Sequence, residues 1–283
     1  MEYSVLENGV KIPMLGFGVY RLDNEIECEK VVTNAIEAGY RHIDTASAYG
    51  NETAVGKAIA KSNVKREDLF ITTKLWVTDT NYNRAKDGFY RSMDKLGVDY
   101  IDLYLIHQPY NDYYGAWRAM EELYSEGKIR AIGVDNFNQV QLADFITFNK
   151  IKPLVNLVES NVFYQRSDDL LYMQSKNVQM EAWSPFGAGN KNIFENKVLT
   201  SLSHKYNKTV AQIILRWLLQ RGIVSLCKSS NIDRMRENLN IFDFCISDED
   251  MALIATLDTN KSCFPERNNG KLTEQFLEKA KYL

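Results

Sequence analysis

Short runs of strand-forming residues alternate with longer runs of helical periodicity along almost the whole chain, and this alternation constrains the fold more than any other feature. The short runs are nearly continuous in apolar residues, as parallel strands between a layer of helices and a barrel core should be. Eight strands are predicted, over 15–18, 41–45, 70–75, 101–107, 129–135, 154–159, 179–184 and 223–227. Eight βα units in 283 residues favour an α/β fold of the (β/α)8 TIM barrel type. We expect residues 1–283 to form a single domain.

The segments between the strands carry the helical patterns. Helices are predicted over 25–38, 85–96, 116–127, 139–148, 167–175 and 210–220. A glycine that can adopt a left-handed C-cap conformation follows several of these patterns, at Gly39, Gly97, Gly127 and Gly222. The helices should therefore end where the next strands begin.

Three segments lie outside this repeat. At the start, residues 3–6 and 10–12 flank Asn8-Gly9, a pair that favours a tight β-hairpin turn. After the seventh strand, the Gly- and Asn-rich segment 187–196 is expected to form a mobile loop. The charged tail 263–283 has a final helical pattern near 273–281 and adds an extra helix near the C-terminus.

Composition excludes several classes of function. The net charge is −3 with both signs interleaved, which argues against nucleic acid or an anionic membrane as a partner. Three histidines and four widely spaced cysteines give no metal-site spacing, so no metal is expected. No secretion signal or membrane span is predicted, and we expect a cytoplasmic monomer. Gly16-Phe17-Gly18 lacks the third glycine of a Rossmann phosphate loop.

Three consecutive predicted strands end in ionisable residues, namely Asp44, Lys74 and His107, and Tyr49 follows five residues after Asp44. Each has an ordinary structural interpretation, as a helix cap, a solvated charge, a core histidine and a packing residue. Barrel enzymes, however, place their active sites at the C-terminal ends of the strands. The coincidence of all four at one rim favours a shared catalytic role.

Carbonyl reduction is a reaction that uses these residue types together. A proton must reach the developing alkoxide while hydride reaches the carbon, so an acid such as Tyr49 must lie within hydrogen-bond reach. An ammonium at Lys74 would make the phenol a better acid, and Asp44 would keep the lysine charged. His107 would orient the substrate oxygen. A barrel isomerase or lyase with Lys74 as a Schiff base remains an alternative, although it leaves Tyr49 unexplained.

Several segments closely resemble the signature sequences of the aldo-keto reductase superfamily. They are residues 39–46 (GYRHIDTA), 48–52 (AYGNE), 72–76 (TTKLW), 103–107 (LYLIH) and 132–137 (IGVDNF). The resemblance covers nearly the whole chain and is greatest to small bacterial-type members related to 2,5-diketogluconate and aldehyde reductases. It implies an NADPH-dependent reductase with the tetrad Asp44, Tyr49, Lys74 and His107 and with Tyr49 as general acid. A non-catalytic nucleotide-binding protein of the same fold, as in potassium-channel β subunits, is the competing class.

The segment after the eighth strand is predicted to bind the cofactor phosphate. Asn231 is placed to cap a helix whose N-terminus attracts anions, and Lys228 and Arg234 add two cations. Two cations around one phosphate favour NADP(H) over NAD(H). The resemblance implies that Lys228, Ser229, Asn231 and Arg234 contact the 2′-phosphate. It further implies that Glu237 and Asn238 hold the adenine.

The resemblance also predicts the nicotinamide and substrate contacts. Trp183, followed by Ser184, occupies the position of the aromatic residue that stacks on the nicotinamide. Asn136 would bind the carboxamide together with residue 135, where Asp135 replaces the usual serine. The common glutamine is replaced by Leu157. The substrate pocket would be lined by Tyr20, Trp76, His107 and Gln108. Gln108 makes the pocket polar, which favours small polar carbonyl compounds such as methylglyoxal or sugar-derived aldehydes.

Overall fold

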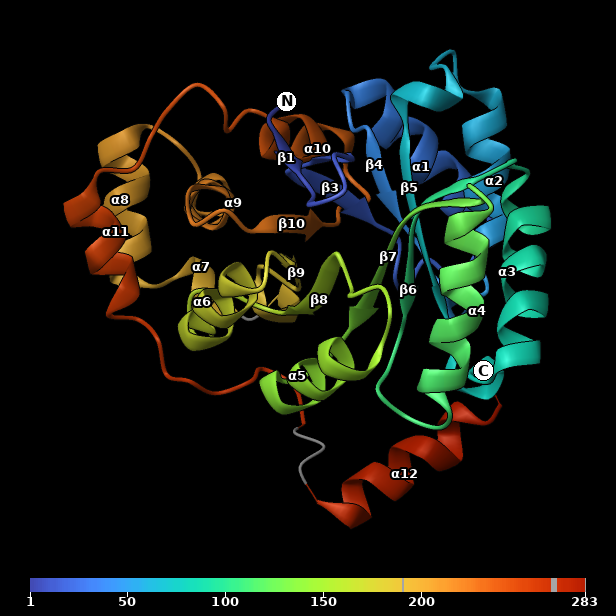
Figure 1. The fold of residues 1–283 in the computed structure, drawn as a ribbon. Helices are drawn as coiled ribbons and strands as arrows, with labels where there is room; N and C mark the ends of the chain where they lie inside the picture. Colours follow the sequence, from blue (N-terminus) through green and yellow to red (C-terminus); the bar gives the residue numbers. More distant parts are fainter. Residues whose placement is uncertain (190, 266–268, 283) are drawn as a thin grey trace.

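A closed barrel of eight parallel strands forms the centre of the molecule (Figure 1). The computed structural model describes residues 1–189, 191–265 and 269–282. The strands follow the order β10-β3-β4-β5-β6-β7-β8-β9 around the barrel. They are β3 (Leu15–Gly18), β4 (His42–Asp44), β5 (Phe70–Leu75), β6 (Ile101–Ile106), β7 (Ile129–Asp135), β8 (Val155–Glu159), β9 (Gln179–Trp183) and β10 (Val224–Cys227). The predicted TIM barrel is confirmed, and each predicted strand is found with its ends within one residue.

Helices surround the barrel and pack on their sequence neighbours, α1 on α2, α2 on α3 and α3 on α4. The helices are α1 (Glu25–Ala38), α2 (Glu52–Lys61), α3 (Tyr82–Leu96), α4 (Tyr113–Ser125), α5 (Gln139–Phe148), α6 (Ser167–Ser175), α7 (Lys191–Phe194), α8 (Lys197–Tyr206), α9 (Val210–Gln220), α10 (Ile232–Leu239), α11 (Asp248–Ala255) and α12 (Gly270–Ala280). Of these, α2, α7, α8 and α11 lie outside the helical patterns found in the sequence. In α2 the pattern is interrupted by Gly56, where a Cβ atom would lie 2.6 Å from the Leu96 carbonyl oxygen at the crossing with α3.

The predicted hairpin is present and closes one end of the barrel. Strand β1 (Tyr3–Val5) pairs antiparallel with β2 (Lys11–Pro13), and Gly9 has a φ of +84° in the turn. The Asn8 amide donates to the Arg130 carbonyl oxygen, and the Ser4 hydroxyl donates to the Gln179 side chain. Because Arg130 and Gln179 stand at the beginnings of β7 and β9, the hairpin covers the N-terminal ends of the strands.

The segment after β9 differs from the predicted loop. It contains a 3-10 turn at Gly187–Gly189 and the short helix α7, and residue 190 lies outside the described residues. The side chain of Ile193 is fully buried in the core, which explains why this Gly- and Asn-rich stretch adopts helical structure. The prediction of an irregular loop was therefore wrong for residues 191–194.

The C-terminal helix α12 lies apart from the helices of the ring, at the opposite side of the molecule from the hairpin (Figure 1). The indole nitrogen of Trp76 donates to the Ala280 carbonyl oxygen at 2.8 Å. The ring of Phe276 packs edge-on against Trp76 at 6.0 Å between centroids. The extra helix predicted near 273–281 is thus attached to the residue that follows β5. Within the described residues, no helix is long and apolar enough to span a membrane.

Candidate active site

The ammonium group of Lys74 is hydrogen-bonded to two of the other predicted rim residues, Asp44 and Tyr49. Its Nζ donates to Asp44 Oδ1 at 2.7 Å, to the Thr45 carbonyl oxygen at 3.0 Å and to the Tyr49 hydroxyl at 3.3 Å. An ammonium has three hydrogens, and these three acceptors use all of them. The Tyr49 oxygen therefore accepts from Lys74, so its own hydrogen is directed to another acceptor.

The local sequence explains this convergence. Strands β4 and β5 are neighbours, with Asp44 opposite Thr72, so that Asp44 and Lys74 meet at the same end of the barrel. After β4 the chain turns through Ser47–Tyr49, and the Ser47 hydroxyl donates to the Lys74 carbonyl oxygen at 2.9 Å. This hydrogen bond fixes the turn that carries Tyr49 against β5.

Burial dominates the electrostatics of this cluster. Lys74 is 1% exposed; burial opposes its charge, but Asp44 and then Tyr49 outweigh that opposition and raise the pKa of Lys74. Burial also raises the pKa of Tyr49, and the opposing effect of Lys74 is smaller. Lys74 lowers the pKa of Tyr49, as predicted from the sequence, but the larger effect of burial was not predicted. The phenol keeps its proton until a reaction requires it.

His107 and Asp135 complete the cluster from β6 and β7. The His107 ring meets the Tyr49 ring edge-on at 5.5 Å and the Trp76 ring at 4.9 Å. Asp135 is 2% exposed, and its Oδ2 lies 3.7 Å from His107 Nε2. Burial and Asp44 raise the pKa of Tyr49, and the charge of Asp135 raises it further. Burial lowers the pKa of Lys74, whereas Asp44, Tyr49 and then Asp135 raise it. The structure therefore adds a second carboxylate to the four residues predicted to act together.

The residues predicted to hold the nicotinamide form a connected group beside His107. The Trp183 indole donates to Asn136 Oδ1 at 3.1 Å, and Asn136 Nδ2 donates to the His107 carbonyl oxygen at 3.3 Å. Asn136 and Ser184 both have positive φ, at 65° and 52°. Leu157 lies opposite Asp135 on β8 and is buried. Trp183 also meets Phe264 of the C-terminal segment, with ring centroids 5.0 Å apart.

The predicted phosphate site lies at the N-terminus of α10. Asn231 caps this helix, because its side-chain oxygen accepts from the backbone amides of Asp233 and Arg234. Lys228 and Arg234 are exposed on either side of the cap, and Ser229 donates its hydroxyl to the Asn231 carbonyl oxygen. The predicted N-cap is confirmed, and the exposed cations suit an anionic ligand.

Two residues predicted to hold the adenine are engaged inside the protein. Glu237 Oε1 accepts from the Thr209 hydroxyl at 2.9 Å. Asn238 is 4% exposed and acts on the buried Tyr40 and Cys227, where it lowers both pKa values against the larger effect of burial. The structure therefore separates these two residues from the exposed group at the helix N-terminus.

Of the residues predicted to line the substrate pocket, Tyr20 and His107 lie against Tyr49. The Tyr20 ring lies 5.0 Å from the Tyr49 ring, and Tyr20 is 56% exposed. Trp76 and Gln108 are buried. Trp76 contacts His107 and also α12, so the C-terminal helix packs against a residue of this site.

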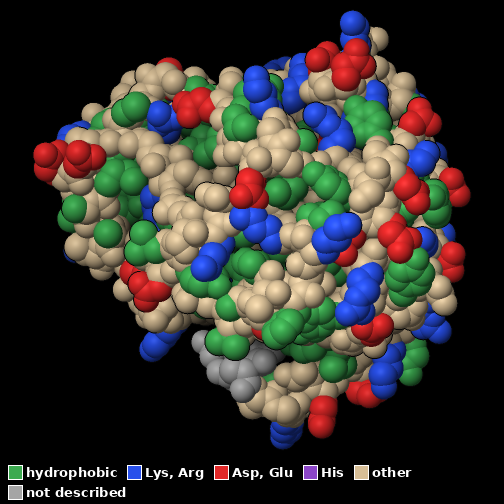
Figure 2. All heavy atoms as spheres, viewed as in Figure 1, with side chains coloured by type: hydrophobic (Ala, Val, Ile, Leu, Met, Phe, Trp, Pro, Cys, Tyr) green, Lys and Arg blue, Asp and Glu red, His purple; other side chains and the backbone are tan. Residues whose placement is uncertain are grey.

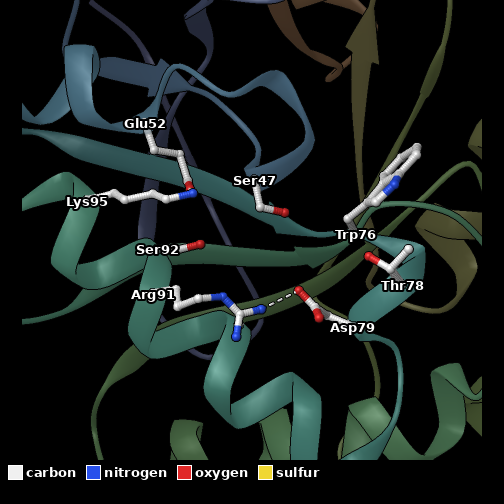
Figure 3. Close-up of a pocket in the computed structure, with 9 residues that line it drawn as sticks. Ser47, Glu52, Trp76, Thr78, Asp79, Arg91, Ser92 and Lys95 are labelled. Carbon is white, nitrogen blue, oxygen red and sulfur yellow. Dashed lines mark hydrogen bonds and ion pairs between the residues drawn. The ribbon is translucent and has the colours of Figure 1, made fainter. Parts of the chain in front are cut away.

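A separate polar pocket of about 190 Å³ lies between α3 and the end of β5 (Figure 3). Arg91 pairs with Asp79 at 2.6 Å, and Lys95 lies 3.8 Å from the buried Glu52. Glu52 also accepts from the Thr73 hydroxyl at 2.7 Å. The ion pairs in this pocket hold α3 against the barrel. Because their charges neutralise one another, they add no unbalanced charge to the proposed tetrad.

Three buried polar residues inside the barrel were not predicted from the sequence: His42, Thr72 and Glu181. They precede Asp44, Lys74 and Trp183 by two positions. Since side chains alternate along a strand, each points into the barrel with the site residue that follows it. The period of two was the signal that could have identified them.

Charged groups gathered at the C-terminal ends of the strands of a (β/α)8 barrel define a barrel enzyme. No cluster of metal-binding side chains occurs among the residues that the structure describes. A profile of the Aldo/keto reductase family matches residues 14–259, and the chain belongs to this family. The resemblance drawn from the sequence motifs is confirmed.

Similar proteins have related activities. Glyoxal reductase of Bacillus subtilis (strain 168) is 45% identical over 261 residues, covering 92% of this chain and 94% of that protein. Methylglyoxal reductase DkgA of Escherichia coli (strain K12) is 41% identical over 264 residues, covering 92% and 95%. The crystal structure of a Bombyx mori aldo-keto reductase in complex with NADP has a TM-score of 0.89 at 35% identity, covering 93% of this chain and 95% of that one.

Proposed function

We propose that this protein reduces small aldehydes or ketones to alcohols with NADPH, and that Tyr49 is the general acid. The observation that carries this proposal is the use of all three Lys74 hydrogens by Asp44, Thr45 and Tyr49. A phenol that accepts from an ammonium has its hydrogen available for a substrate oxygen. Bound NADPH supplies the hydride.

The residues of the chain divide the remaining tasks. Tyr49 donates its proton to the carbonyl oxygen as negative charge develops there, and Lys74 then stabilises the phenolate that remains. Asp44 holds the ammonium in place. His107, whose ring meets Tyr49 edge-on, orients the substrate oxygen.

The cofactor proposal assigns the exposed cations of the α10 cap to the 2′-phosphate. Lys228, Ser229, Asn231 and Arg234 would surround this group, and the two cations favour NADPH over NADH. Trp183 and Ser184 would contact the nicotinamide, with Asn136 and Asp135 at its carboxamide. Glu237 and Asn238 remain proposed for the adenine, although their present contacts must change if they are to reach it.

Small dicarbonyl compounds are the proposed substrates, because relatives of similar length are named for glyoxal and methylglyoxal. Tyr20, Trp76 and Gln108 provide two aromatic walls and one amide for such molecules. On the face in Figure 2, basic and acidic side chains are interspersed, which favours a small-molecule partner over nucleic acid. A monomer in the cytoplasm, formed from a single domain, remains the prediction from sequence.

The test is oxidation of NADPH with methylglyoxal in the presence of the protein and its Tyr49→Phe variant. The variant should lose about a hundredfold or more of kcat while NADPH affinity is kept, because only the proton donor is removed. Tyr20→Phe, which changes a neighbouring phenol, is the matched control and should retain most of its turnover. Equal turnover by Tyr49→Phe and the unchanged protein would refute the assignment. NADPH binding without turnover of any aldehyde would favour the non-catalytic class.

The phosphate assignment is tested by the affinities of Arg234→Ala for NADPH and NADH. The loss for NADPH should be about tenfold larger, since one charge-assisted contact is removed from the 2′-phosphate. Arg236→Ala removes a cation from the other side of the same helix and should leave both affinities unchanged. Equal losses for the two cofactors in Arg234→Ala would contradict the assignment.

A further inference from the structure

Glu159 is a buried carboxylate at the end of β8 that the proposed mechanism does not use. Its side chain is 4% exposed, and Trp183 lies opposite it in the register of β8 with β9. Three hydrogen-bond donors reach its two oxygens. Two of these donors belong to residues 262–264, which lie 103 and 104 positions further along the chain, between α11 and α12 (Figure 1).

These hydrogen bonds attach the later segment to the barrel. The Ser262 hydroxyl donates to Glu159 Oε2, and the Cys263 amide donates to Oε1 at 2.9 Å. The third donor is Asn161 Nδ2, which lies 3.3 Å from Oε1. A carboxylate that is removed from water needs such donors, because an unpaired buried charge is costly. Glu159 and residues 262–264 therefore hold each other at the end of β8.

Ser262 extends this attachment to Phe264. Its Oγ, which donates to Glu159, also accepts from the Phe264 amide at 3.0 Å. The Phe264 ring packs against Trp183 with ring centroids 5.0 Å apart and an interplanar angle of 68°. Edge-on aromatic pairs of this kind are favourable beyond their apolar burial. The carboxylate thus fixes the backbone of Phe264 and, with it, the ring beside the indole.

Trp183 connects this attachment to the candidate active site. Its indole nitrogen donates to Asn136 Oδ1 at 3.1 Å, and Asn136 Nδ2 donates to the His107 carbonyl oxygen at 3.3 Å. Every step from Glu159 through Phe264 and Trp183 to His107 is a direct contact. The indole is held by a hydrogen bond at its nitrogen and by the Phe264 ring.

The neighbouring parts of the C-terminal segment have attachments of their own. The Thr259 amide and hydroxyl both donate to the Phe163 carbonyl oxygen, at 2.9 and 2.8 Å. Beyond Phe264, the Ala280 carbonyl oxygen accepts from Trp76. Because these contacts do not involve Glu159, its replacement should release residues 262–264 and leave the rest of the segment in place.

We propose that Glu159 is a positioning residue that fastens residues 262–264 beside Trp183, so that the indole is held in place for the nicotinamide ring of the cofactor. The contacts lead to the nicotinamide side of the site, and the retention of the cofactor therefore depends on Glu159 more than proton transfer does. The effect on the cofactor rests on the proposed function, whereas the attachment itself does not.

Hydrogen exchange of the whole protein, measured by NMR, tests the attachment without any cofactor. Glu159→Met fills a similar volume but cannot accept a hydrogen bond, so the Cys263 and Phe264 amides should exchange about tenfold faster than in the unchanged protein. Glu159→Gln keeps a carbonyl oxygen for the Cys263 amide and should exchange at a rate close to that of the unchanged protein. Unaltered exchange of both amides in Glu159→Met would overturn the proposal, whether or not the protein binds NADPH.

Ser262→Ala is a milder variant that keeps the buried carboxylate. It removes the hydroxyl between Glu159 and Phe264 and leaves the Cys263 amide bonded to Glu159. The Phe264 amide should therefore exchange faster, while the Cys263 amide should change little. Equal exchange of the Phe264 amide in Ser262→Ala and the unchanged protein would contradict the attachment through Ser262.

The dissociation rate of NADPH tests the positioning role. NADPH should leave Glu159→Met about tenfold faster, whereas kcat at saturating NADPH should stay within about twofold, and Glu159→Gln should restore slow dissociation. The matched control is Asp250→Leu, which removes a second buried carboxylate; Asp250 accepts from Lys205 and joins α11 to α8. This control should leave the dissociation rate unchanged.

The two measurements separate the possible failures. Unchanged NADPH dissociation in a Glu159→Met protein whose residues 262–264 exchange freely would overturn the positioning role. An equal loss of NADPH affinity and of kcat in Glu159→Met and Asp250→Leu would show general destabilisation and would also overturn it. If the unchanged protein bound no NADPH, the proposed function and the cofactor part of this proposal would both be refuted, and hydrogen exchange would still decide the attachment.

Discussion

A buried ionisable group lies at each end of strand β6, and the two groups differ in their surroundings. Near the start of β6, Asp102 Oδ1 accepts from Arg130 at 2.7 Å, and Oδ2 accepts from Arg66 at 2.6 Å and from the Ile71 amide at 2.9 Å. At the other end, His107 faces Asp135, with Asp44 and Lys74 beyond them. There, Asp44 has only one of its two oxygens bonded within the described residues.

This contrast distinguishes a charged group that stabilises the fold, Asp102, from charged groups that are proposed to take part in catalysis. A carboxylate with donors on both oxygens ties strands β5, β6 and β7 together and offers little to a ligand. A cluster with unmet hydrogen-bonding capacity is less stable by itself but can bind and move protons. The same strand thus supports the fold at one end and carries the proposed chemistry at the other.

Substitution of Asp102 should give the largest change in stability. Asp102→Asn leaves two guanidinium groups without an anion, and the free energy of unfolding should fall by about 3 kcal/mol. The effect should not exceed this, because the Arg130 side chain is 42% exposed and can be hydrated. Urea unfolding measures the loss, and turnover at a temperature where the variant is folded should stay within about twofold. A large loss of turnover in a fully stable variant would erase the contrast between the two ends.

Substitution of Lys74 should reduce turnover more than stability, in contrast to substitution of Asp102. Lys74→Met removes the cation that holds the Tyr49 oxygen, and kcat should fall about a hundredfold, close to 2.7 kcal/mol. Stability should change less than in Asp102→Asn, because Asp44 can then take up a proton. Lys95→Met is the matched control, since the Lys95 side chain is 47% exposed and the same atoms are exchanged. If Lys74→Met kept half of its turnover, the ammonium would have no catalytic role.

Asp135 should produce the smallest of the three effects, and it acts on the ligand. Its negative charge beside the proposed nicotinamide site should favour the oxidised, cationic ring. Asp135→Ser should therefore lower the affinity for NADP+ relative to NADPH by about fivefold, as expected for one charge at a partly screened distance. Asp135→Asn keeps the shape and should show the same shift. Titration of both cofactors by tryptophan fluorescence gives the ratio, and an unchanged ratio in both variants would exclude the electrostatic effect.

The barrel, and the meeting of Asp44, Tyr49 and Lys74 at one of its rims, could be predicted from the sequence because both follow from local patterns. The eight apolar runs give the strands, and the residue that ends each run gives the rim. Gly56 shows where this fails: a tight crossing with α3 requires a glycine inside α2, and the helical pattern is weakened. Ile193 shows the reverse, since one buried side chain makes a Gly- and Asn-rich segment partly helical.

The environment of the site residues could not be predicted from residue types. The presence of Lys74 indicated a lower pKa for Tyr49. Burial raises this pKa, and its effect, which depends on the closed barrel, is larger than that of Lys74. Glu181 had the strand period that places it beside Trp183, yet only the three-dimensional arrangement shows that its oxygens lack donors. Likewise, the internal contacts of Glu237 come from α9, which is distant from it in sequence.

The hydrogen bond between Trp76 and Ala280 joins residues separated by 204 positions. During synthesis, the tetrad and all eight strands have left the ribosome well before residue 280 does. A chain interrupted between β10 and α12 would carry every residue of the proposed tetrad but would lack the helix that packs against Trp76. The residues of the proposed chemistry are therefore synthesised well before the segment that lies behind Trp76.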